Sequence, residues 1–97
     1  MKQLKAKIRD IVDFPIPGII YKDITPLLQD ATSLQLSVSE LAKPFKKIPI
    51  SAVAGMEARG FIFGSLVAAE LNVGFIPLRK PGKLPHSVES ISYSLEY

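Results

Sequence analysis

Closely spaced glycines and basic side chains in the middle of the chain could bind phosphate or pyrophosphate. The turn from Gly55 to Gly60 follows an apolar run and precedes a helical pattern of apolar residues. A turn from a buried strand into a helix leaves backbone N–H groups unpaired, and the helix dipole adds partial positive charge. Arg59 adds a guanidinium whose planar fork matches phosphate oxygens. The turn therefore predicts an anion site, although a plain strand-to-helix connection with a surface arginine fits the spacing equally well.

A second group of basic residues follows the next predicted strand. Arg79, Lys80 and Lys83 come directly after residues 75–78, at the carboxyl edge where parallel α/β sheets bind ligands. Together with Arg59 they would supply enough positive charge for a pyrophosphate-like group. A solvated basic loop is the alternative interpretation.

Two familiar nucleotide motifs are excluded by the residues present. The Gly55–Gly60 spacing is that of a P-loop, but Phe61 and Ile62 stand where Lys and Ser/Thr are required. The glycine pattern of a dinucleotide-binding turn is also absent from the sequence.

Two side chains near the end of the chain could transfer protons. Glu96 lies on the polar face of an alternating segment, 91–97, and could act as a general acid or base if it is shielded from water. An exposed strand glutamate is the alternative. His86 is the only histidine, and without partner residues it is predicted to be exposed and not to bind a metal.

The elements that position these residues follow from apolar spacing. The recurrence of Leu4, Ile8, Ile11 and Val12 predicts an N-terminal amphipathic helix that ends before Pro15. Residues 14–21 carry two prolines and a glycine, which predicts an extended, turn-rich loop.

Two helices are expected next. Thr25 and Pro26 read as the cap and first residue of one helix. Asp30 is expected to cap a longer helix, which Pro44 ends or kinks. Its expected inward stripe is Leu34, Val38, Leu41, Ala42 and Phe45.

A strand–helix–strand unit forms the predicted centre. Residues 50–54 are the first strand, and 75–78 the second. The helix between them is predicted to be mostly buried and to end at Asn72 or Gly74. Its apolar positions are Phe61, Leu66, Val67, Ala69 and Leu71. Such units pair their strands in parallel. A loop of about a dozen residues starts at Lys80, and loops of that length are usually functional or mobile.

Composition sets further limits. The 97 residues, 47% hydrophobic and 22% charged, suit one soluble domain or part of one. Because there is no cysteine, a disulfide framework is excluded, and a reducing cytosol is the expected compartment. No apolar run reaches the roughly 20 residues that span a bilayer, and the first residues lack a signal-peptide core. The net charge of +3 comes from lysines without interleaved aromatics, so nucleic acid is not an expected partner.

Four segments in order resemble one known family: FPIPGIIYKDITPLL, AGMEARGFIFG, PLRKPGKLP and SYSLEY. They are similar to the first half of adenine phosphoribosyltransferases, which have the type I phosphoribosyltransferase fold. The resemblance implies an α/β fold whose parallel sheet is flanked by helices, with an N-terminal hood and a sheet that is incomplete in this chain. It divides the chain into an N-terminal helix and base-binding hood (1–30), a helix plus βαβ core with the pyrophosphate loop (31–79), and a flexible lid with a returning strand (80–97).

The implied reaction moves a phosphoribosyl group from phosphoribosyl pyrophosphate to adenine, giving AMP and pyrophosphate with Mg²⁺ assisting. By resemblance, Ile20 binds adenine through its backbone and Lys22 contacts the purine's other edge. Many relatives carry arginine at the position of Lys22, which would make a bidentate contact that lysine cannot make. Glu96 corresponds to the acid/base residue that protonates the purine at N7, and Tyr97 to the neighbouring lid tyrosine.

The pyrophosphate-binding positions implied by the resemblance are Glu57, Ala58, Arg59, Arg79, Lys80 and Lys83. The peptide between Glu57 and Ala58 is expected to be cis, and Arg79 to reach across a homodimer interface. No metal-ligating residue is assigned. A cytoplasmic enzyme of purine salvage is implied, with no nucleic-acid or membrane partner.

The family's phosphoribosyl pyrophosphate signature, paired acids followed by a Thr/Gly-rich loop, is not found in the 97 residues. We therefore expect a fragment that is inactive alone and function that belongs to an intact protein. A non-catalytic, phosphoribosyltransferase-like regulator or nucleotide-binding module is the alternative. Such a regulator would not need Glu96 or the base hood.

Overall fold

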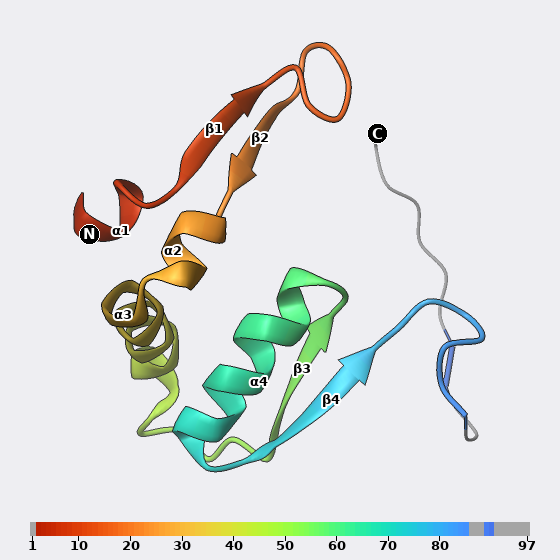
Figure 1. Ribbon diagram of the computed structural model, residues 1–97. Helices are drawn as coiled ribbons and strands as arrows, with labels where there is room; N and C mark the ends of the chain where they lie inside the picture. Colours follow the sequence, from red (N-terminus) through yellow and green to blue (C-terminus); the bar gives the residue numbers. More distant parts are fainter. Residues whose placement is uncertain (1, 86–88, 91–97) are drawn as a thin grey trace.

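The computed structural model describes residues 2–85, 89 and 90 and is drawn in Figure 1. Two strand pairs are linked by helices. The elements in order are α1 (Lys2–Lys5), β1 (Arg9–Val12), β2 (Ile20–Asp23), α2 (Thr25–Gln29), α3 (Ala31–Ala42), the 3₁₀ turn η1 (Lys43–Phe45), β3 (Ala52–Met56), α4 (Arg59–Leu71) and β4 (Gly74–Leu78). β1 pairs antiparallel with β2, and β3 pairs parallel with β4.

The N-terminal segment is a hairpin, so the predicted long amphipathic helix is wrong. Only Lys2–Lys5 is helical, and β1 continues into a loop that returns as β2. The cross-strand partners carry opposite charges, with Arg9 opposite Asp23 and Asp10 opposite Lys22. These pairs and the β-branched residues of β1 favour the sheet over the helix.

The loop between β1 and β2 is turn-rich, as the prolines predict. The Phe14–Pro15 peptide is cis, and Gly18 takes φ +90°, a conformation that suits glycine. The Gly18 N–H donates to the Asp13 carboxylate at 2.8 Å, which closes the loop. Ile20 and Tyr21, however, lie in β2, so the extended loop is shorter than predicted.

Helices α2 and α3 contain most of the buried apolar residues of the described chain. Asp30 caps α3 by accepting a hydrogen bond from the Ser33 N–H at 3.0 Å, and α3 ends before Pro44, as predicted. Thr25 is the first residue of α2 and not its cap, a shift of one position. Among the described residues, the buried apolar side chains are Leu27, Val38, Ala42 and Ala68.

The predicted inward stripe of α3 is only partly correct. Val38 and Ala42 are buried, but Leu41 and Phe45 are 49% and 45% exposed. Ser33 and Ser37 are buried in their place. The Ser37 hydroxyl donates to the Ser33 carbonyl at 2.8 Å, so a small polar side chain is buried with its hydrogen bond satisfied.

The β3–α4–β4 unit confirms the predicted parallel βαβ arrangement, and Asn72 ends α4 in the left-handed conformation. β3 lies two residues later than predicted, because β4 begins at Gly74 and pairs that residue with Ala52. Helix α4 covers one face of the strands, where Phe61 and Phe75 meet edge to face with ring centroids 6.0 Å apart.

The opposite face of the β3–β4 pair is open in the described part of the chain. Side chains alternate across a strand, so Ile76 and Leu78 point away from the face that carries Phe75. They are 51% and 46% exposed. Helix α4 is less buried than predicted, since only Ala68 is fully buried and Ala69 is exposed. No helix in residues 2–85 is long and apolar enough to cross a membrane.

Candidate active site

The predicted anion turn is a tight connection between β3 and α4. β3 ends at Met56 and α4 begins at Arg59. The intervening Glu57–Ala58 peptide is cis, as the resemblance implied. A Cβ atom on Gly55 would lie 2.5 Å from the Gly60 carbonyl oxygen and 2.8 Å from the Phe75 ring. The turn can close this tightly only because residue 55 has no side chain.

The basic residues after β4 lie beside this turn. The Lys80 N–H donates to the Glu57 carboxylate at 2.8 Å. The Arg79 guanidinium lies 3.7 Å from the other Glu57 oxygen, and the Glu57 N–H donates to the Leu78 carbonyl at 3.4 Å. The turn and the basic loop, which the sequence analysis expected to serve one anion, are therefore joined through Glu57.

Arg79 and Lys83 are held in the same loop. The Arg79 guanidinium donates to the Lys83 carbonyl at 3.2 Å and lies 5.8 Å from the Phe61 ring centroid. The Lys83 N–H donates to the Lys80 carbonyl at 3.3 Å. The Lys83 carbonyl and the Phe61 ring hold the Arg79 side chain, which is 35% exposed, so part of it still faces solvent.

The pKa of the Glu57 carboxyl reflects the positive charge of the neighbouring basic loop. The Lys80 N–H hydrogen bond, and then the charges of Arg79, Lys80 and Lys83, lower the pKa of the Glu57 carboxyl below its ordinary value, against the opposing effect of partial burial. The carboxylate is thus an anion already bound to the loop where the sequence predicts that an external anion binds.

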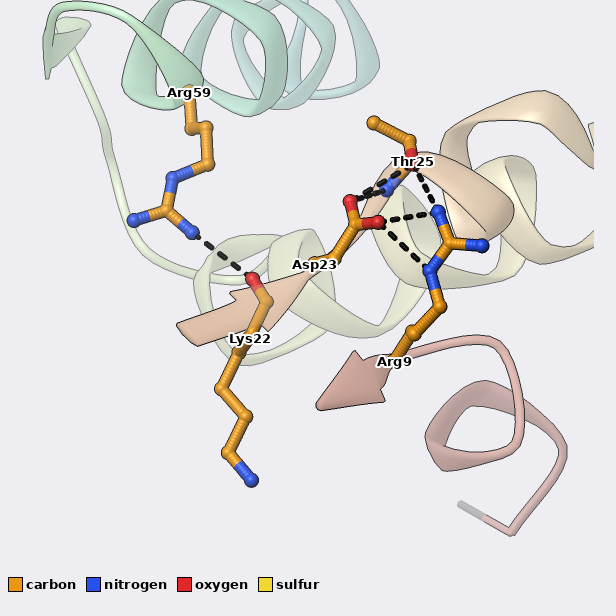
Figure 2. A network of polar contacts seen from close by, with 5 residues as sticks. All are labelled: Arg9, Lys22, Asp23, Thr25 and Arg59. Atoms are coloured by element: carbon orange, nitrogen blue, oxygen red, sulfur yellow. Dashed lines mark hydrogen bonds and ion pairs between the residues drawn. The ribbon is translucent and has the colours of Figure 1, made fainter. Parts of the chain in front are cut away.

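Arg59 points to a different part of the site. Figure 2 shows it reaching from α4 toward β2, where it donates to the Lys22 carbonyl at 3.5 Å. Its guanidinium carbon lies 5.4 Å from the Tyr21 ring centroid, within range of a cation–π contact. The structure therefore brings Arg79, Lys80 and Lys83 together at Glu57, while Arg59 connects the turn to the hairpin. Tyr21 was not singled out by the sequence analysis, because its contact with Arg59 depends on the folded hairpin.

The residues assigned to adenine lie on β2. Ile20 is 55% exposed and pairs with Val12, and Lys22 extends its ammonium to the Asp10 carboxylate at 2.6 Å. The side chains of Lys22 and Asp10 are 61% and 56% exposed, so this pair is solvated. An exposed ion pair of this kind is worth little and can exchange with another partner.

Asp23 anchors the base of the hairpin, a role that the sequence analysis missed. It accepts hydrogen bonds from the Thr25 N–H at 3.0 Å, the Thr25 hydroxyl at 2.8 Å and the Arg9 Nε at 2.9 Å, as drawn in Figure 2. The Thr25 N–H, and next the Arg9 side chain, hold the pKa of Asp23 at about 2. The spacing Asp-x-Thr-Pro was the available signal, since Asp commonly bonds the backbone two residues on.

Glu96, Tyr97 and His86 lie outside the described residues. In the described part of the chain, no group of three or more His, Cys, Asp or Glu side chains is placed to hold a metal ion.

Comparison with known proteins gives a consistent result. No family model matches the chain. Curated adenine phosphoribosyltransferases from Methylococcus capsulatus and Nitrosococcus oceani are 64% and 65% identical to it over 97 residues, which is 100% of this chain. The chain covers 57% of each of those proteins, so it spans little more than half their length.

Solved structures agree with the sequence match. The adenine phosphoribosyltransferase of Thermoanaerobacter pseudethanolicus superposes with a TM-score of 0.93 at 49% identity, covering 99% of this chain and 56% of that one. The Saccharomyces cerevisiae enzyme, complexed with an imino-altritol bisphosphate and adenine, gives 0.81 at 34% identity, covering 89% and 53%. The chain is similar over its whole length to the N-terminal part of adenine phosphoribosyltransferases and has the corresponding part of their type I phosphoribosyltransferase fold.

Proposed function

We propose that a full-length protein containing this chain transfers the phosphoribosyl group of phosphoribosyl pyrophosphate to adenine, giving AMP and pyrophosphate. The observation that carries the proposal is the joining of the Met56–Gly60 turn to Arg79, Lys80 and Lys83 through Glu57. Curated relatives of the same family support the choice of adenine.

The basic loop would act on the leaving group. When the bond from ribose C1′ to pyrophosphate breaks, negative charge builds up on the pyrophosphate oxygens. The Lys80 N–H and the Arg79 guanidinium are already positioned to bind an anion, because they contact the Glu57 carboxylate, and Lys83 adds positive charge in the same loop. Donors fixed before the reaction stabilise developing charge without reorganisation.

The hairpin would hold the base. β2 presents the Ile20 backbone and the Lys22 side chain, and Arg59 connects this strand to the first turn of α4. This connection would place the base and the pyrophosphate at a defined separation, as a displacement at C1′ requires. Glu96 is proposed to handle the proton at the purine ring, with Tyr97 beside it in the lid.

Further parts of the proposal concern cofactor and assembly. Mg²⁺ is proposed to arrive bound to the diphosphate oxygens of the substrate, since Mg²⁺ commonly uses few carboxylates together with substrate phosphates. A cytoplasmic homodimer is proposed.

The experiment uses a chimera in which this chain is followed by the part of the Methylococcus capsulatus relative that lies beyond the matched segment. Formation of AMP from adenine and phosphoribosyl pyrophosphate is measured for the chimera, for Glu96→Gln and for Glu40→Gln. Glu40 is an exposed residue of α3 and serves as the charge-matched control.

Loss of a general acid should lower kcat by about 10²-fold or more in Glu96→Gln, whereas Glu40→Gln should match the parent. An equal kcat for Glu96→Gln and the parent would remove Glu96 from the mechanism. A folded chimera that forms no AMP would overturn the proposed function.

A further inference from the structure

Glu57 occupies an unexpected position for a residue in an anion site. Its side chain is 24% exposed, and its carboxylate faces the basic loop. One oxygen accepts the Lys80 N–H at 2.8 Å, and the other lies 3.7 Å from the Arg79 guanidinium. A negative side chain at this place repels an incoming phosphate and already uses donors that the phosphate needs.

The contacts of Glu57 also hold the two loops together. The Glu57 N–H donates to the Leu78 carbonyl, so its backbone is tied to the end of β4. Within the described part of the chain, residues 79–83 also make internal hydrogen bonds from Arg79 to Lys83 and from Lys83 to Lys80, and Arg79 approaches the Phe61 ring. The Glu57 carboxylate is therefore the side chain that fixes the Lys80 N–H in the absence of another anion.

We propose that the Glu57 carboxylate is an internal substitute for the pyrophosphate, which holds the Arg79–Lys83 loop in place and must be displaced when pyrophosphate binds. The inference rests on the proposed function, because it assumes that this loop is the pyrophosphate site. The Glu57 side chain then competes with the pyrophosphate and is not one of its direct ligands.

Displacement has two consequences. The parent protein binds pyrophosphate more weakly than its cluster of cations would allow, because the contacts to Glu57 are lost on binding. In return, the loop is held near its binding position before the ligand arrives, which reduces the ordering required on binding.

The test measures pyrophosphate affinity by calorimetry in the chimera described above, for the parent, Glu57→Gln, Glu57→Ala and Glu70→Gln. Glu70 lies in the last turn of α4 and pairs with Lys46. It is about 16 Å along the helix from Arg59, beyond the Debye length of about 10 Å at 0.1 M salt. Glu70→Gln therefore makes the same change in net charge without a contact to the basic loop.

The proposal predicts that Glu57→Gln binds pyrophosphate about three- to tenfold more tightly than the parent, because an ion pair is removed while the side-chain length is kept. Glu70→Gln should stay within a factor of two of the parent. In ligand-free protein, the Lys80 amide should exchange with solvent faster in Glu57→Ala than in the parent, since its hydrogen-bond acceptor is gone.

Weaker binding in both Glu57 variants would show that the carboxylate contributes to the pyrophosphate site, and would overturn the proposal. Equal tightening in Glu57→Gln and Glu70→Gln would reduce the effect to net charge and would also overturn it. If the parent binds pyrophosphate and forms AMP but the Glu57 variants bind no more tightly, the inference fails while the proposed function stands. If no variant binds pyrophosphate, both fail.

Discussion

Gly55→Ala should destabilise the fold by a clash at the anion turn. The added Cβ would lie 2.5 Å from the Gly60 carbonyl oxygen, and 2.8 Å and 2.9 Å from two atoms of the Phe75 ring. The nearest of these is backbone at the start of α4, so it cannot move away by a change of rotamer. Overpacking of this kind costs about 1–3 kcal/mol of unfolding free energy. For proteins of about 150–250 residues, that lowers Tm by about 2–4 °C per kcal/mol.

The assay is thermal unfolding of the full-length chimera, followed by circular dichroism, with Gly74→Ala as the matched control. Gly74 begins β4, and a Cβ added there would meet nothing within 4 Å. Gly74→Ala should leave Tm unchanged or slightly raised, because alanine loses less backbone entropy on folding. A Gly55→Ala protein as stable as Gly74→Ala would refute the close approach of residues 55, 60 and 75.

Further predictions concern the core, the hairpin, the basic residues and the open sheet. Leu27 is 4% exposed, so Leu27→Ala should lower the free energy of unfolding in urea by about 2–5 kcal/mol. Leu41 is 49% exposed, so Leu41→Ala should lower it far less. Equal losses of unfolding free energy would show that Leu27 does not lie in the core. Because the pKa of Asp23 is about 2 and its ordinary value is 3.8, the carboxylate's contribution to stability should be complete above that ordinary value and be lost as pH falls toward 2. Urea midpoints of the parent should therefore fall more steeply over that range than those of Asp23→Asn, and parallel curves would argue against the anchor. Arg59→Ala should weaken pyrophosphate binding, measured by calorimetry, about ten- to a hundredfold, because the guanidinium is expected to turn from β2 to the ligand. An affinity within a factor of two of the parent would show that Arg59 only contacts β2. The 97-residue chain by itself should self-associate through the open face at Ile76 and Leu78, and a monodisperse monomer in sedimentation velocity at tens of micromolar would contradict this.

The βαβ unit and the α3 helix could be predicted from the sequence because their signals are local. Asp30 and Pro44 mark the ends of one helix, and Asn72 closes the other. The parallel pairing follows from the order strand–helix–strand alone. The predicted strand 50–54 begins two residues before β3. Apolar residues such as Ile50 precede the true start, and where pairing begins depends on the partner strand, which the local sequence does not show.

The hairpin could not be predicted by helical periodicity. Leu4, Ile8 and Ile11 have helical spacing, but the pairing of Arg9 with Asp23 joins residues far apart in sequence. A search for complementary charges on either side of the proline-rich loop would have found it. The buried Ser33 and Ser37 were missed for a related reason, since their hydrogen bonds arise only once the helix has formed.

For the candidate site, the sequence predicted that Arg59, Arg79, Lys80 and Lys83 gather in one region, but in the structure Arg59 turns to β2, and Glu57 links the turn to the loop that carries the other three. The spacing placed Arg79, Lys80 and Lys83 after a strand, and their proximity to the turn through Glu57 follows from parallel pairing. The orientation of Arg59 toward Tyr21 depends on where the hairpin lies relative to α4, which no local pattern encodes.

The central claim is that two separate parts of this chain bind two parts of the reaction's ligands. It is tested most directly by recording amide chemical shifts of the isotopically labelled chimera while pyrophosphate and adenine are added in separate titrations. The account predicts that pyrophosphate shifts the amides of residues 56–60 and 79–83, and that adenine shifts those of 19–22. Shifts at the same amides for both ligands, or none at these segments for either, would contradict it.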